Sequence, residues 1–461
     1  MQSKPFELKI KPSGKPTWPA PPIIEIFLLI FIKKSYYNIR MKTKVQNYKI
    51  MNKKSKTIDK CQISGTRDLK TILSLGYLPP VNKLRKINTS LEEDSFYPAE
   101  LMFSKSSKLV QLSTLVDKEI LFPKEYPYTS STTKILRENF KELYKECRKI
   151  INISKKDLII DIGSNDGNLL SNFRNNHRVL GVTPEKIGNI AIKRGIPTLL
   201  KYFDKFTSNL IVKKYGKAKI VTATNVFAHI ENVDQLMKNL LKILDKNGVF
   251  ISESHYLVSL IQTNQYDTIY HEHLRYYSLE SLKYLFNKYG MKIIHAKKID
   301  THGGSIRVYA TRKNNFKIEK SVAKILNFEK NFLTWKTFKK FKKNVVDSKL
   351  NLYSILKKLK ANKKKIYGVG APSRGSTLIN YVGLDENIID CILEIEGSYK
   401  IGNYIPGKKI PILSEKKLYK DPPHYVILFS WHIASELKKN LKKRGYKGKF
   451  IIPLPQPRIE D

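Results

Sequence analysis

Imidazole and carboxylate groups are concentrated in one stretch of the chain, YDTIYHEHLRYYS, residues 266–278. His271 and His273, two of nine histidines, lie on either side of Glu272. A histidine that is hydrogen-bonded to a neighbouring glutamate is oriented and made more basic, as removal of a proton next to a carbonyl requires. The stretch therefore indicates acid–base chemistry on a carbonyl compound.

A metal site fits these histidines poorly. Residues two apart share a face only in a strand, and neither an i, i+4 histidine pair nor a distal third ligand is evident. The purely structural alternative is a polar turn packed against a sheet. We expect no metal at this stretch.

A second motif, DIGSNDGNLL (residues 161–170), places Asp161 at the end of an apolar run. Gly163 and Gly167 follow at a tight strand-to-helix turn, where glycine lets the backbone approach a ligand closely. The D-x-G-x-x-x-G spacing is not the G-x-G-x-x-G of dinucleotide enzymes. It resembles the first motif of class I S-adenosylmethionine (SAM) methyltransferases, which makes Asp161, Gly163, Asn165 and Gly167 candidate cofactor residues. An ordinary turn with Asn165 as a helix cap is the alternative.

Two further motifs follow strands. In ATNVFAHIENVD (residues 223–234), the methyltransferase fold would bring Asn225 towards the methyl donor and His229 towards the acceptor, although a lone histidine is more often a surface or capping residue. In GVGAPSRG (residues 368–375), small residues suit a phosphate and Arg374 adds charge, with a tight structural turn as the alternative.

The segments that position these motifs alternate between apolar runs and amphipathic stretches. We expect strands at DLIIDIG, HRVLGV, AKIVTATNVF and GVFISES, and helices at residues 132–147, NDGNLLSNFRNN, PEKIGNIAIKRG and VDQLMKNLLKILDKNG. This alternation predicts an α/β fold, with a parallel sheet that binds ligands at the carboxyl ends of its strands. MKIIHAKKID and SIRVYATRK would close the sheet as an antiparallel pair.

Five regions are predicted along the chain. They are a non-native or disordered extension (1–50), a small irregular N-terminal domain (51–125), a methyltransferase domain (126–315), a helical connector (316–360) and a second Rossmann-like domain (361–461).

The charge balance is strongly basic, with 85 Lys and Arg against 40 Asp and Glu and a net charge of +45. The lysines are spread along the whole chain, so a solvated coat is preferred to a nucleic-acid surface. The apolar run at residues 23–32 is too short to span a bilayer. Three widely spaced cysteines indicate a reducing compartment, so we expect a cytoplasmic protein with no membrane or nucleic-acid partner.

From about Cys61 to its end the chain resembles the sugar C-methyltransferase family. The resemblance is carried by DIGSNDG, NVFAHI, YDTIYHEHLRYYS, HGGSIRVY, GVGAPSRGSTLINY and KIGNYIPGKKIPI, in this order. It implies a SAM-dependent enzyme with a small zinc-binding domain, a central methyltransferase domain and a Rossmann-like C-terminal domain. The implied reaction is methylation at C-3 of a nucleotide-linked 4-keto-deoxysugar.

The resemblance also implies roles for individual residues. His273 would be the base, with Glu272 and Tyr270 beside it. His229 and a tyrosine of EYPYTS, Tyr126 or Tyr128, would line the sugar site. His271 and Arg374 complete the candidate substrate-binding residues.

Two positions depart from the family pattern. Of four zinc-binding cysteines only Cys61 is present, because the other positions are Ser64, Ser104 and Ser107, and we therefore predict no structural zinc. Thr183 stands where the family has an acidic residue that binds the ribose hydroxyls.

Two other readings stay open. One is a nicotinamide-dependent oxidoreductase that uses GVGAPSRG with Asp390 or Glu394 as its ribose ligand. The other is a non-catalytic basic binding protein on a methyltransferase scaffold. The sequence leaves open the sugar, the nucleotide, the methylated carbon and the oligomeric state.

Overall fold

The structure is a computed structural model that describes residues 55–90, 94–121, 134–312 and 316–461. Residues 55–461 form one compact unit. The predicted extension (1–50), Tyr126 and Tyr128 lie outside the described residues.

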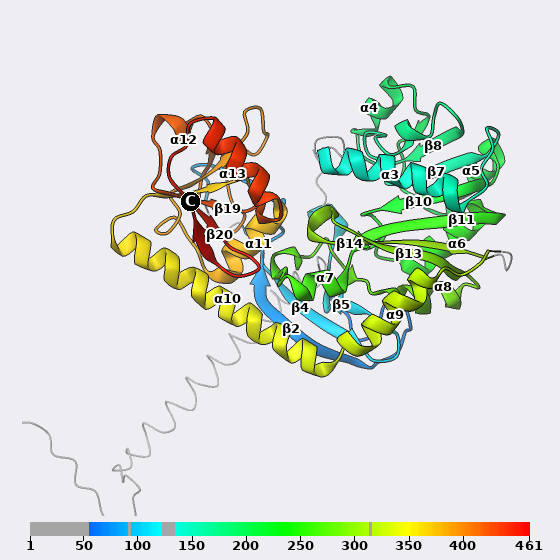
Figure 1. The fold of residues 1–461 in the computed structure, drawn as a ribbon, viewed down its shortest axis with the longest axis horizontal. Coiled ribbons are helices and arrows are strands. Elements are labelled where there is room, and N and C mark those ends of the chain that lie inside the picture. The colour runs from blue at the N-terminus through cyan, green and yellow to red at the C-terminus, as the bar shows by residue number, and fades with distance from the viewer. Residues whose placement is uncertain (1–54, 91–93, 122–133, 313–315) are drawn as a thin grey trace, which may run out of the picture. The chain divides into compact units, whose positions relative to one another are not determined.

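A seven-stranded sheet occupies the centre of the chain, in the order β13-β14-β11-β10-β7-β8-β9 (Figure 1). The strands are β7 (Leu158–Ile162), β8 (Arg178–Val182), β9 (Thr198–Leu199), β10 (Ala218–Thr224), β11 (Leu244–His255), β13 (Lys292–Ile299) and β14 (Ser305–Thr311). Neighbours from β9 to β11 are parallel, whereas β14 is antiparallel to both β11 and β13. This is the class I methyltransferase order, and the predicted antiparallel pair is confirmed.

The helices of this domain are α3 (Lys134–Ile150), α4 (Gly188–Lys193), α5 (Lys205–Tyr215), α6 (Val233–Ile243), α7 (Leu257–Gln262) and α8 (Leu279–Lys288). Two helix predictions are wrong. NDGNLLSNFRNN forms only a 3-10 turn, Leu170–Asn172, because the side chains of Ser171 and Asn172 both bond the Asn168 carbonyl. Helix α6 ends at Ile243, since Leu244 already pairs with Ala218 in the sheet.

The N-terminal region is more regular than predicted. It contains a four-stranded sheet of β2 (Leu69–Leu78), β4 (Tyr97–Ser104), β5 (Val110–Leu112) and β12 (Arg275–Tyr276). The alternation in β2 is hard to recognise because its register against β4 shifts twice. Strand β12 belongs to the stretch that contains the YHEH motif. This stretch therefore supplies one strand of the N-terminal sheet, next to β5. Beside this sheet, β1 (Ser55–Thr57) pairs with β6 (Thr114–Val116), and α2 (Lys118–Leu121) follows.

The C-terminal part begins with α9 (Lys320–Phe332) and α10 (Trp335–Ala361), both in the region where a helical connector was expected. A second sheet has the order β18-β16-β15-β19-β20-β21. Its strands are β15 (Ile366–Val369), β16 (Cys391–Glu394), β18 (Ile412–Ser414), β19 (Tyr425–Leu428), β20 (Lys449–Ile452) and β21 (Arg458–Glu460), with helices α11 (Ser373–Val382), α12 (Lys417–Lys420) and α13 (Ala434–Lys443). β17 (Asn403–Tyr404) pairs with β3 (Arg85–Lys86) of the N-terminal region.

Candidate active site

Four histidines meet at the carboxyl ends of the parallel strands of the central sheet. His229 follows β10, His255 ends β11, His302 lies in the turn between β13 and β14, and His273 comes from the YHEH motif. The ring of His273 lies 5.0 Å from that of His229 and 4.8 Å from that of His255, which is 5.7 Å from that of His302. The Tyr270 ring lies 4.1 Å from His273. We call these four histidines the imidazole cluster.

A small cavity of about 30 Å³ lies among these groups. It is lined by Asn225, Ala228, His229, Ser254, His255, His273, Arg275 and Tyr276. A cavity of this size admits about one water-sized group, so an acceptor as large as a sugar must enlarge it on binding.

Backbone hydrogen bonds fix the protonated nitrogen of two rings. The Nδ1 of His273 lies 2.8 Å from the Thr268 carbonyl oxygen, and the Nδ1 of His229 lies 2.6 Å from the Glu272 carbonyl oxygen. A carbonyl only accepts, so each Nδ1 carries the proton, and in neutral His273 the lone pair lies on Nε2. The expected orienter of His273, the Glu272 carboxylate, instead accepts a hydrogen bond of 2.6 Å from Asn82 Nδ2. Thr268 therefore fixes the His273 tautomer.

Burial keeps the cluster uncharged. It lowers the pKa of His273 and of His255 well below the ordinary value, and neighbouring imidazoles and Arg374 add to the effect. Burial also lowers the pKa of His229, and lowers that of His302 to about 4. At neutral pH the four rings are therefore neutral.

His271 lies outside the cluster. Its Nε2 donates to the Pro98 carbonyl at 3.0 Å, and its ring meets the edge of Tyr97 at 5.8 Å. The structure thus corrects the expected substrate role of His271, because its side chain packs against the N-terminal sheet.

Arg374 is also engaged within the protein. Its guanidinium forms two hydrogen bonds to the Asp267 carboxylate, of 2.8 and 3.0 Å, and one of 3.2 Å to Gln265 Oε1. Trp431 Nε1 donates to the same carboxylate at 2.8 Å, and His432 Nδ1 lies 3.1 Å from the guanidinium. The sequence suggested that Arg374 would face a substrate phosphate. In the structure its guanidinium instead bonds Gln265 and Asp267, in the segment before the YHEH motif.

The glycine turn after β7 offers groups that suit a polar nucleoside ligand. Gly163 has φ +76°, and a Cβ there would lie 2.2 Å from Val226 Cγ2, so only glycine fits. Ser164 Oγ and Asn225 Oδ1 are buried without a hydrogen-bond partner among the described residues. Burial raises the pKa of Asp161 to about 7, although Thr222 donates to it at 2.6 Å. These unpaired oxygens at the strand ends fit the methyl donor SAM.

The departure at Thr183 has a structural counterpart. Thr183 is buried, and its hydroxyl donates to the carboxylate of Glu185, which is half-buried three residues beyond the end of β8. A carboxylate is thus present next to the position where the family pattern has one.

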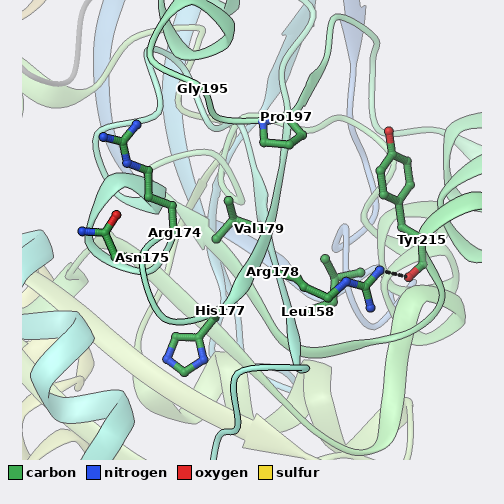
Figure 2. Close-up of a pocket in the computed structure, with 9 residues that line it drawn as sticks. All are labelled: Leu158, Arg174, Asn175, His177, Arg178, Val179, Gly195, Pro197 and Tyr215. Carbon is green, nitrogen blue, oxygen red and sulfur yellow. Dashed lines mark hydrogen bonds between the residues drawn. The ribbon is translucent and has the colours of Figure 1, made fainter.

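A larger cavity, of about 470 Å³, lies at the amino ends of the parallel strands, opposite the imidazole cluster. Figure 2 shows the residues that line it. It is lined by Leu158, Arg174, Asn175, His177, Arg178, Val179, Gly195, Pro197 and Tyr215. Leu158 and Arg178 are the first residues of β7 and β8, and Arg178 donates to the Tyr215 carbonyl at 2.9 Å. Size alone would favour this cavity, but the buried histidines with lowered pKa values lie at the carboxyl ends of the strands.

The N-terminal knuckle, residues 61–68 with 104–107, does not fit a zinc ion. Cys61 Sγ lies 3.1 Å from Ser107 Oγ, and Asp68 accepts from Ser104 Oγ at 2.8 Å and from the Ser106 amide at 2.6 Å. One thiol and three hydroxyls are a poor donor set for zinc. In the described residues no group of three or more His, Cys, Asp or Glu side chains is arranged to hold a metal.

The sequence analysis did not identify two histidines of the imidazole cluster, or the residue that bonds the Glu272 carboxylate. His255 directly follows the strand GVFISES, and its position after a strand was a usable signal. His302 belongs to the HGG turn and has a left-handed backbone (φ 57°). Its Nε2 lies 3.2 Å from Nδ2 of Asn225. Nothing in the sequence pointed to Asn82.

Comparison with known proteins gives three consecutive family matches. Residues 61–122 match a "putative zinc binding domain", residues 134–296 a "methyltransferase domain" and residues 300–455 a "C-methyltransferase C-terminal domain". C-methyltransferase NovU of Streptomyces niveus is 29% identical over 408 residues, which cover 87% of this chain and 97% of NovU.

Solved structures match about 38% of the chain at low similarity. Magnesium protoporphyrin IX methyltransferase (ChlM) from Synechocystis PCC 6803 with bound SAM is 13% identical, with a TM-score of 0.30 over 38% of this chain and 79% of that chain. A SAM-dependent methyltransferase from Anabaena variabilis is 16% identical, with a TM-score of 0.31 over 38% and 84%. Similarity at this level says nothing about the substrate.

The family assignment thus agrees at two levels. The central sheet has the class I strand order, and the three matched domains follow one another along the chain, most of which also aligns with NovU. Over residues 61–455 the chain is therefore similar to C-methyltransferases.

Proposed function

We propose that the acceptor is a nucleotide-linked keto-deoxysugar and that His273 is the base that makes its carbon nucleophilic. The observation that carries the proposal is the imidazole cluster, in which the tautomer of His273 leaves Nε2 basic at a cavity beside the glycine turn. A neutral, buried imidazole suits removal of a proton from the carbon next to a ketone.

The reaction has two parts. His273 Nε2 takes the proton, and the electron pair moves onto the ketone oxygen as an enolate. SAM, which Asp161, Gly163 and Asn225 would hold, would supply the electrophilic methyl group that becomes bonded to the enolate carbon, with S-adenosylhomocysteine as the leaving group. His229 and Tyr270 line the path of the acceptor, and Asp161, Gly163 and Asn225 lie where the donor would bind.

The oxidoreductase alternative is less well supported. Glu394, its candidate ribose ligand, accepts a hydrogen bond of 2.6 Å from the Ala371 amide of the GVGAPSRG turn. Asp390 bonds the Ile366 amide at 2.9 Å. Both carboxylates thus have structural partners in their own domain.

A cytoplasmic location belongs to the same proposal, because Cys61, Cys147 and Cys391 are all buried thiols without disulfides. Among the described residues no helix is both long and apolar enough to cross a membrane.

The test is transfer of a ¹³C-labelled methyl group from SAM to a nucleoside-diphosphate-linked 4-keto-deoxyhexose, with the product identified by NMR. A new carbon–carbon bond next to the ketone is the expected result. Binding of SAM without transfer to any keto-sugar tested would overturn the sugar assignment, and transfer to oxygen or nitrogen would overturn the enolate mechanism.

A further inference from the structure

Four arginines are buried in the described residues, and one of them differs from the rest in its partners. Arg85 pairs with Asp94 at 3.4 Å, Arg307 with Glu253 at 2.6 Å and Arg374 with Asp267 at 2.8 Å. The fourth, Arg275, is 1% exposed and forms no ion pair with any described carboxylate.

Neutral oxygens hold Arg275 in place. Its Nε donates to the Tyr277 hydroxyl at 3.0 Å and its Nη1 to the side-chain oxygen of Gln62. Nη1 and Nη2 also donate to the backbone carbonyls of Glu231 (3.3 Å) and Ile230. All these partners satisfy the guanidinium without cancelling its charge.

A buried positive charge without a carboxylate is costly, so its location is informative. Arg275 lines the cavity of about 30 Å³ together with His229, His255 and His273. The surrounding imidazoles are neutral, which leaves a net positive field at the place where the proposed enolate would form. Such a preorganised charge stabilises a developing anion more strongly than the uncharged ketone.

We propose that Arg275 is the electrostatic stabiliser of the enolate, and that the N-terminal knuckle serves catalysis by presenting Gln62 to it. Gln62 follows Cys61 directly, and its backbone amide bonds Gln111 Oε1 at 2.8 Å. Arg275 itself pairs with Gln111 between β12 and β5. The small domain therefore holds the arginine from two sides. This inference rests on the proposed function.

Three variants separate charge from shape. Arg275→Met removes the charge and is expected to lower kcat by about 10²-fold or more, with the Kd for SAM unchanged. Arg275→Lys keeps the charge and is expected to retain kcat within about tenfold. Gln62→Glu keeps the arginine but sets a carboxylate beside it, and should lower kcat by at least about tenfold. Gln235→Glu, an exposed amide on α6, is the matched control and should have no effect.

The readouts are kcat and KM for methyl transfer and calorimetric SAM binding, which also reports folding. Full kcat in Arg275→Met or in Gln62→Glu would overturn the inference. An equal loss in Arg275→Lys and Arg275→Met would also overturn it, because the fork geometry and not the charge would then matter. If Arg275→Met does not fold, Gln62→Glu decides alone. Activity that survives His273→Gln would instead contradict the proposed function.

Discussion

The N-terminal knuckle and the imidazole cluster are both dense groups of polar side chains, but they use their hydrogen bonds differently. In the knuckle, Asp68, Ser104 and Ser106 bond mainly to one another and to the local backbone. In the cluster, His229 and His273 each use Nδ1 for a backbone carbonyl and line a cavity. A group whose bonds close on themselves stabilises a fold, whereas a group that turns basic atoms to a cavity can react.

Substitution of the proposed base should give the largest effect. His273→Gln is expected to lower kcat by about 10²–10⁴-fold, the usual contribution of a general base. The free energy of unfolding should change little, because glutamine can still donate to Thr268. His177→Gln is the matched control, since His177 also bonds a backbone carbonyl, that of Ser154 at 2.8 Å, but lies at the opposite edge. Equal activities in the two variants would show that His273 is not the base.

His271 should contribute to stability and not to catalysis, as the knuckle network does, although it lies in the YHEH motif. Burial lowers its pKa to about 4 from 6.5, so the unfolded state binds more protons between these values. The contribution to stability is therefore complete above pH 6.5 and is lost as the pH falls towards 4. Between pH 7 and pH 4, wild type should lose about 3 kcal/mol more unfolding free energy than His271→Gln. Urea titrations at both pH values measure this, and parallel curves would contradict it.

Loss of the central carboxylate should destabilise the knuckle. Although burial opposes it, hydrogen bonds from Ser106, Thr66 and Ser104 lower the pKa of Asp68 to about 2, so the group is ionised. Asp68→Ala is expected to lower the unfolding free energy by about 1–3 kcal/mol, because these donors lose their acceptor. Asp59→Ala, which breaks an exposed ion pair with Arg67, is the control and should cost under about 0.5 kcal/mol. A larger loss in the control would show that the Asp68 network is not special.

We expect the donor site to depend on Glu185, whose carboxylate accepts a hydrogen bond from Thr183, the residue at the acidic position of the family pattern. Glu185→Gln is expected to raise the Kd for SAM about tenfold, through loss of a charge-assisted bond to the ribose. Calorimetric titration measures it, with Glu386→Gln, an exposed carboxylate of the C-terminal domain, as the control. An unchanged Kd would exclude Glu185 as the ribose ligand.

Metal removal should give no effect at all. Dialysis against a zinc chelator is expected to leave Tm and SAM affinity unchanged, since hydrogen bonds between Cys61 and Ser107 and around Asp68 occupy the knuckle. A fall in Tm that added zinc reverses would show that the knuckle holds a metal after all.

Much of the fold could be predicted from the sequence. Strands such as β7, buried at every residue, appear as continuous apolar runs, and the DIGSNDG turn follows directly from its glycines. Two helix predictions failed because other hydrogen bonds compete with those of a helix. Side chains bond the Asn168 carbonyl and prevent one helix, and pairing of Leu244 with Ala218 in the sheet ends the other.

The candidate site could be predicted only in part. His229 and His273 were recognisable from their motifs. His255 and His302 join them because of the order of strands in the sheet, which no local pattern encodes. The partners of Arg374 and Arg275 lie up to 213 residues away along the chain, so the paired role of the first and the unpaired charge of the second emerge only from the packed structure.

The most direct test of the central claim is hydrogen exchange in deuterated buffer without methyl transfer. The protein is mixed with a nucleoside-diphosphate-linked 4-keto-deoxyhexose and S-adenosylhomocysteine, and NMR follows deuterium at the carbon next to the ketone. The account predicts exchange by wild type at a rate at least about 10²-fold above that of His273→Gln. Equal exchange rates for the two proteins would contradict the assignment of His273 as the base.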